Sequence, residues 1–98
     1  MDIRILVEEE YGYRHWIWDV KATSHEALDT YFSSVVEAED FFVSGKPNKH
    51  FIGEWTEIDY ETYKEEGMIQ NWDAWAHIHM NEDSNIRFYN EPPVRNIQ

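Results

Sequence analysis

The sequence predicts an α+β fold, in which a single antiparallel β-sheet of four to five strands is packed by one main helix and a short second helix. Three observations support this prediction. Runs rich in β-branched and aromatic residues recur near both ends of the chain. Between them, one segment carries apolar residues at helical spacing. The length of 98 residues is typical of one domain, so we expect one domain over residues 1–91 and a tail over residues 92–98.

The first two strands form a predicted hairpin. Residues 3–7 are apolar and β-branched, and the acidic run at residues 8–10 leads into a turn. Residues 13–20 follow as the second strand. Alternation along this strand places Trp16 and Trp18 on the same face.

The main helix is predicted between residues 24 and 38. Thr23 and Glu26 have the spacing of a capping box, in which each side chain hydrogen-bonds the backbone N–H group of the other residue. An apolar stripe follows at intervals of three and four residues, and we expect it to face the sheet. The stripe consists of Leu28, Tyr31, Phe32, Val35 and Val36.

The middle of the chain predicts a loop and a third strand. Residues 40–43 fit either a last helical turn or a short strand, and residues 44–49 have the composition of a loop. Residues 51–58 then form a strand with apolar groups on both faces.

A short helix and a second hairpin complete the prediction. The helix begins after the N-cap Asp59 and ends at Gly67, for which we expect a left-handed conformation. The last two strands cover residues 72–80 and 86–89, and a polar turn joins them.

The charge of the chain restricts its partners. The sequence holds 20 Asp and Glu residues against 8 Lys and Arg, which makes a formal charge of −12 with neutral histidines. This charge repels nucleic acid and anionic membranes and favours cationic partners. The chain contains no Cys, which excludes disulfides, thiolate metal sites and cysteine nucleophiles. The glycines are isolated and the serines lack a nucleophile elbow, so we expect a non-enzymatic protein without a cofactor.

The sequence also predicts a cytoplasmic protein without a membrane partner. The N-terminus lacks the pattern of a signal peptide, and the longest apolar runs are much shorter than a membrane span. The absence of Cys fits an intracellular compartment.

Carboxylates cluster in the segment from Glu54 to Glu66, which holds six of them and one Lys. Such an array imitates the phosphates of a nucleic acid and would bind the Lys and Arg residues of a nucleic-acid-binding protein. Small size, high negative charge and an excess of aromatic residues are together similar in composition to phage-encoded inhibitors of restriction or CRISPR machinery. The alternative is a solvated surface that serves solubility alone. The predicted partner-binding carboxylates are Glu8, Glu9, Glu10, Glu54, Glu57, Asp59, Glu61, Glu65 and Glu66.

Trp16 and Trp18 share their strand face with Arg14, and this strip is a second candidate for partner binding. Its partner would be a basic protein or a second copy of the chain, and self-association would make the protein a homo-oligomer. The alternative is that the two rings cover the helix as part of the core.

His77 and His79 lie two residues apart on a predicted strand, a spacing that allows both imidazoles to chelate a metal ion. A third ligand would come from His15, His50 or Glu54 if their strands are neighbours. The alternative is that these are half-exposed polar residues of a strand. A metal-binding or small-molecule-binding domain that uses His77, His79 and His15 is therefore a further functional hypothesis.

Overall fold

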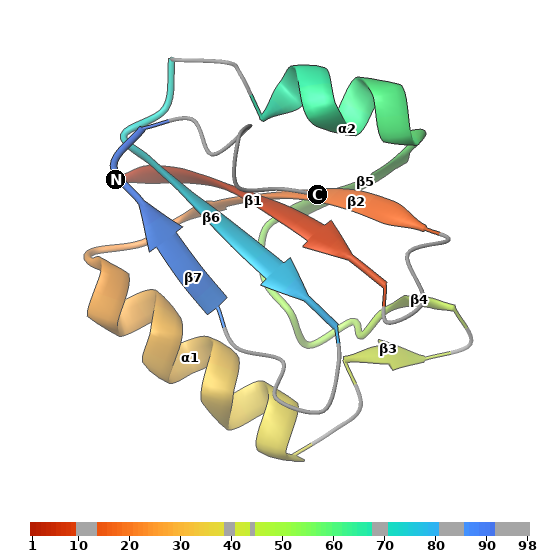
Figure 1. Cartoon of the computed structure of the whole chain (residues 1–98). Coiled ribbons are helices and arrows are strands. Elements are labelled where there is room, and N and C mark those ends of the chain that lie inside the picture. The colour runs from red at the N-terminus through yellow and green to blue at the C-terminus, as the bar shows by residue number, and fades with distance from the viewer. Residues whose placement is uncertain (10–13, 39–40, 44, 68–70, 81–85, 92–98) are drawn as a thin grey trace.

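The computed structural model describes residues 1–9, 14–38, 41–43, 45–67, 71–80 and 86–91. Figure 1 shows a twisted sheet with a helix on either side. In chain order the elements are β1 (Asp2–Glu8), β2 (His15–Lys21), α1 (His25–Ala38), β3 (Phe42–Val43), β4 (Lys46–Pro47), β5 (Glu54–Ile58), α2 (Tyr60–Glu66), β6 (Ala74–His79) and β7 (Ile86–Tyr89).

Five strands form the main sheet, in the order β5-β2-β1-β6-β7 (Figure 1). The predicted α+β fold is confirmed, and the five strands of the main sheet agree with the predicted four to five. The prediction that every strand pair is antiparallel is wrong, because β1 and β6 pair in parallel, with Ile3 opposite Ala74. The chain leaves β5 at one edge of the sheet, continues as α2 over β2 and β1, and returns as β6 on the far side of β1. A crossover of this kind joins strands that run in the same direction.

The two helices cover opposite faces of the sheet (Figure 1). Leu28 and Phe32 of α1 pack on the larger apolar core, to which β1, β2 and β6 contribute alternate residues. Tyr63 of α2 is fully buried and packs on Leu6 and Ile17 on the other face. Because the core under α2 is small, polar side chains share that face of the sheet with it.

The start of α1 differs from the prediction by one residue. Ser24 is the N-cap, since its hydroxyl accepts a hydrogen bond from the backbone N–H of Ala27 at 3.0 Å. The helix therefore begins at His25, and Ala27 occupies the third helical position. The predicted capping box of Thr23 and Glu26 is wrong for this reason.

The ends of α2 confirm one prediction and correct another. The carboxylate of Asp59 accepts a hydrogen bond from the backbone N–H of Thr62 at 2.7 Å, so Asp59 is the N-cap as predicted. Gly67 closes the helix with a φ of −65°, which is a right-handed conformation. Its N–H bonds the carbonyl of Tyr63 in the ordinary helical way. The predicted left-handed glycine is therefore wrong.

The connections also differ in detail from the prediction. Residues 44–49 were expected to be loop, but β4 lies among them and pairs with β3 in a small second sheet. β3 confirms the short-strand alternative for this part of the chain. The strand β1 extends through Glu8, which therefore does not belong to a turn. The predicted turn at residues 81–85 and the predicted tail at residues 92–98 lie outside the described residues.

Candidate functional site

The predicted acidic segment is exposed along β5 and α2. β5 is an edge strand of the sheet, and α2 begins directly after Asp59. Alternation directs Glu54 and Glu57 to opposite faces of this edge, and α2 presents further carboxylates to solvent. We call the exposed carboxylates of this region the acidic surface; they are Glu54, Glu57, Asp59, Glu61 and Glu65.

Nearby cations neutralise only part of the acidic surface. Arg14 Nε lies 2.9 Å from Glu57 Oε2, and Lys64 Nζ lies 3.4 Å from Glu61 Oε1. Three carboxylates of the acidic surface have no ion-pair partner among the residues that the structure describes: Glu54, Asp59 and Glu65. The acidic surface therefore keeps a net negative charge in the folded protein.

Asp59 combines its charge with a structural role. Its carboxylate caps α2 through Thr62, and the hydrogen bonds from Thr62 hold the pKa of Asp59 below its usual value. The carboxylate is fully ionised at neutral pH, but one of its oxygens is engaged with the helix. Asp59 is for this reason less available to a partner than Glu54 or Glu65.

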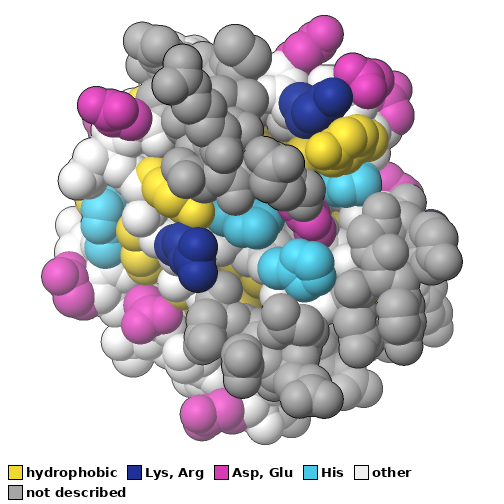
Figure 2. Space-filling model, in the orientation of Figure 1, with side chains coloured by type: hydrophobic (Ala, Val, Ile, Leu, Met, Phe, Trp, Pro, Cys, Tyr) yellow, Lys and Arg dark blue, Asp and Glu magenta, His cyan; other side chains and the backbone are white. Residues whose placement is uncertain are grey.

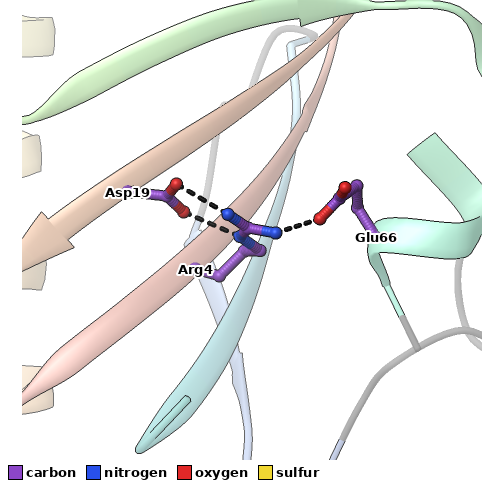
Figure 3. A network of polar contacts seen from close by, with 3 residues as sticks. All are labelled: Arg4, Asp19 and Glu66. Carbon is purple, nitrogen blue, oxygen red and sulfur yellow. Dashed lines mark hydrogen bonds and ion pairs between the residues drawn. The ribbon is translucent and has the colours of Figure 1, made fainter. Parts of the chain in front are cut away.

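Glu66 belongs to an internal network with Arg4 and Asp19 (Figure 3). Arg4 Nε donates to Asp19 Oδ1 and Arg4 Nη2 donates to Asp19 Oδ2, both at 2.8 Å, in a bidentate arrangement. Arg4 Nη1 donates to Glu66. The guanidinium carbon lies 4.4 Å from the ring centroid of Trp72. The network ties β1 to β2 and to the last residue of α2, and it removes Glu66 from the acidic surface.

A pocket of about 560 Å³ opens beside this network. It lies where the end of β2 meets the start of β5. The backbone is tight here: Gly53 has a φ of 97°, and a Cβ at this position would lie 2.5 Å from the carbonyl oxygen of Asp19. We call this hollow the edge pocket; its lining includes Asp2, Asp19, Lys21, Ile52, Glu54 and Trp72.

Sequence reasoning identified Glu54 but missed the rest of the edge pocket. One signal was present, because Arg4 and Asp19 carry opposite charges on facing strands of the predicted hairpin. Ile52 and Trp72 carried no such signal. Ile52 lies just before β5 and Trp72 just before β6, in segments without regular secondary structure. A strand pattern does not predict the path of such segments.

Glu8 lies at the centre of a second polar group, on the α2 face of β1. Its side chain is buried, with a relative exposure of 4% for the residue. Its Oε1 accepts a hydrogen bond from the Tyr63 hydroxyl at 3.3 Å and lies 3.1 Å from His77 Nε2. Its Oε2 lies 3.5 Å from His79 Nδ1. Figure 2 shows histidine side chains gathered around an acidic side chain on this face. We call these four residues the Glu8 cluster.

Burial and charge shift the pKa values of this region in opposite directions. Burial by itself would raise the pKa of Glu8. The hydrogen bond and charge of His77, the charge of His79 and the hydrogen bond from Tyr63 outweigh burial and lower the pKa. Burial and the charge of Glu8 raise the pKa of Tyr63. Burial lowers the pKa of His15, whose ring centroid lies 4.7 Å from that of Tyr63. At neutral pH the cluster therefore holds an ionised carboxylate and a protonated tyrosine.

The three histidines that were predicted as metal ligands lie on one face of the sheet. His77 and His79 contact Glu8, and His15 is opposite Glu8 in the register of β1 and β2. Across the described ranges, however, no group of three His, Cys, Asp or Glu side chains is arranged to hold a metal ion. The contacts of His15, His77 and His79 among the described residues therefore do not supply a set of ligands for a metal ion.

Besides Glu8 and Glu66, four predicted partner-binding residues lie away from the exposed acidic surface or outside the described chain. Trp16 and Trp18 are buried beneath α1, as the core alternative has it, so neither ring is an exposed anchor. Glu9 is half-buried. Glu10 lies outside the described residues.

In comparisons with protein-family models, with curated proteins and with solved structures, the chain matches none of them. Neither α1 nor α2 is long and apolar enough to cross a membrane, and this holds for the described part of the chain.

Proposed function

We propose that this chain is a non-enzymatic binding protein whose acidic surface docks on a basic site of a partner protein. One observation carries the proposal: the carboxylates of β5 and α2 are exposed together at one edge of the sheet, and the described cations leave Glu54 and Glu65 unpaired. Such a surface attracts Lys and Arg residues over a distance of about 10 Å at moderate salt.

The partner that fits this surface best is a nucleic-acid-binding protein, which the chain would inhibit by occupying its basic site. Sites that bind nucleic acid present several Lys and Arg side chains spaced to meet phosphates. A helix and an adjacent strand offer carboxylates at fixed positions, so the docking is specific in its geometry as well as in its charge. Binding should weaken strongly with added salt because the contacts are exposed ion pairs.

A pair of charge-reversal variants tests the proposal. The first is Glu61→Lys with Glu65→Lys, which changes α2 and leaves the Arg4 network and the edge pocket intact. The matched control is Asp29→Lys with Glu37→Lys, which makes the same change of net charge on the exposed side of α1. Each tagged protein is used to capture partners from a lysate of the organism that encodes the chain, and the captured proteins are identified by mass spectrometry.

We expect the wild-type protein and the α1 control to capture the same nucleic-acid-binding protein, which salt and competing duplex DNA release. The α2 variant should lose it. With that partner purified, the Kd of the α2 variant should rise at least tenfold, since reversal replaces attraction by repulsion at two positions. Equal binding by both variants would mean that the acidic surface serves solubility alone and would overturn the proposal.

A further inference from the structure

We propose that the edge pocket binds the side chain of an arginine residue of the basic partner. The inference rests on the proposed docking of a basic protein and assigns a single anchor point to it. The pocket lies at one end of the acidic surface, since Glu54 belongs to both. Its volume of about 560 Å³ is within the usual range of pockets for small ligands.

The excess of negative charge in the edge pocket favours a cation as its ligand. Asp19 and Glu54 are directly opposite in the antiparallel pair of β2 and β5, and facing like charges destabilise a sheet. Arg4 lies on the other side of Asp19, in β1, and binds both of its oxygens. Glu54 therefore has no cation among the described residues, and a guanidinium beside it would relieve the repulsion.

Lys21 does not fill this role. Its ammonium lies 4.0 Å from Asp2 Oδ1, at the end of β2, and its side chain is almost fully exposed. It lies two positions after Asp19, on the same face of β2. Among the described lining residues the carboxylates of Asp2, Asp19 and Glu54 thus outnumber the single lysine.

The apolar part of the lining matches the stem of an arginine. Ile52 is 52% exposed, one of the few large apolar residues in the described chain that face solvent. Its position is held by the backbone: its carbonyl accepts a hydrogen bond from Trp18 Nε1 at 2.5 Å, and its N–H donates to the Tyr31 hydroxyl at 2.7 Å. A fixed apolar wall beside a carboxylate suits a side chain with an apolar stem and a charged head.

The protein already contains one arginine bound in this manner. The guanidinium of Arg4 lies over the ring of Trp72 and makes a bidentate contact with Asp19. Trp72 and Asp19 both line the edge pocket. Planar stacking on an aromatic ring and paired hydrogen bonds to carboxylates are the properties that distinguish arginine from lysine, and this favours arginine as the occupant.

The test uses N-acetyl-arginine amide as the probe and N-acetyl-citrulline amide, its uncharged isostere, as the ligand control. Each is titrated at constant ionic strength into the full-length, isotope-labelled protein, up to a concentration of roughly 50 mM, well above a millimolar Kd. The backbone amides of Gly53 and Glu54 and the indole N–H of Trp72 are followed by NMR. The protein variants are Glu54→Gln and, as a matched control outside the pocket, Glu65→Gln.

We expect the arginine probe to shift the three pocket signals and the citrulline probe to leave them in place. Glu54→Gln should weaken binding of the arginine probe about fivefold. This factor corresponds to the upper end of the free energy that one exposed ion pair usually contributes. Glu65→Gln should bind as the wild-type protein does. Shifts confined to α2, equal shifts with citrulline, or no effect of Glu54→Gln would each overturn the inference.

The two proposals fail separately. If the arginine probe does not bind the pocket but the Glu61→Lys, Glu65→Lys variant loses the partner, the docking proposal stands and the pocket inference is rejected. If the probe binds the pocket in a Glu54-dependent manner and the variant retains the partner, the pocket binds arginine but the docking proposal is rejected.

Discussion

Replacement of Arg4 by methionine should destabilise the protein strongly. The change keeps an unbranched apolar stem on β1 and removes the guanidinium that joins Asp19 to Glu66 (Figure 3). Two carboxylates would then remain close together without a cation between them. The fall in stability therefore has two sources. Three charge-assisted hydrogen bonds and the contact with Trp72 are lost, and a repulsion between the two carboxylates is gained.

The size of the effect follows from the partial burial of the network. A hydrogen bond to a charged group contributes about 1.5–3 kcal/mol when buried. The side chains of Arg4, Asp19 and Glu66 are 14%, 23% and 28% exposed, so water compensates part of the loss. We expect the free energy of unfolding to fall by about 3 kcal/mol, out of a total of about 5–15 kcal/mol for a domain of ordinary stability. The melting temperature should fall by about 12–24 °C, at about 4–8 °C per kcal/mol.

Urea unfolding followed by tryptophan fluorescence measures this loss. Arg87→Met is the matched control, because Arg87 is an exposed arginine on β7 with no ion pair to a described residue, and its loss should cost less than about 0.5 kcal/mol. A double-mutant cycle with Asp19→Asn should give a coupling energy above about 1 kcal/mol. A loss of less than about 1 kcal/mol for Arg4→Met, or no coupling to Asp19, would refute the reasoning.

Two further predictions concern the strands around the candidate sites. Because burial lowers the pKa of His15 from 6.5, its contribution to stability should be complete above pH 6.5 and should be lost as the pH falls through its folded pKa; His15→Phe should remove this decline in urea unfolding below pH 6.5, and an unchanged decline would contradict the assignment. Gly53→Ala should destabilise the protein by more than about 2 kcal/mol, because Gly53 has a φ of 97° and a new Cβ would lie 2.5 Å from the Asp19 carbonyl oxygen; thermal unfolding checks this, and a neutral substitution would show that the backbone at the edge pocket adapts.

Local features of the fold were predictable from the sequence. The two-residue alternation identified β2 and its shared tryptophan face, and the apolar stripe identified α1, in which Leu28 and Phe32 are buried. Asp59 was recognised as an N-cap because its role depends only on residues up to Thr62. These features are set by neighbours in the chain, which a sequence pattern records directly.

The parallel pairing of β1 and β6 was not predictable in this way, since it follows from the path of α2 across the sheet. Glu8 was misplaced for a similar reason. It stands in a run of three glutamates that resembles a turn, and its contacts with His77 and His79 come from a distant strand. Alternation also showed that Trp16 and Trp18 share a face, but it did not show that α1 buries that face.

The parallel pair at the centre of the sheet has a consequence for the kinetics of folding. Residues of β1 and β6 that pair in the sheet lie about 70 positions apart in the sequence. The hairpin of β1 and β2 has short sequence separation and should form early, but one edge of β1 then stays open until β6 arrives. An open edge offers unpaired backbone groups to other chains. The pairing of β6 with β1 should therefore be the slow step of refolding. At high protein concentration, chains in which only the hairpin of β1 and β2 has formed should aggregate.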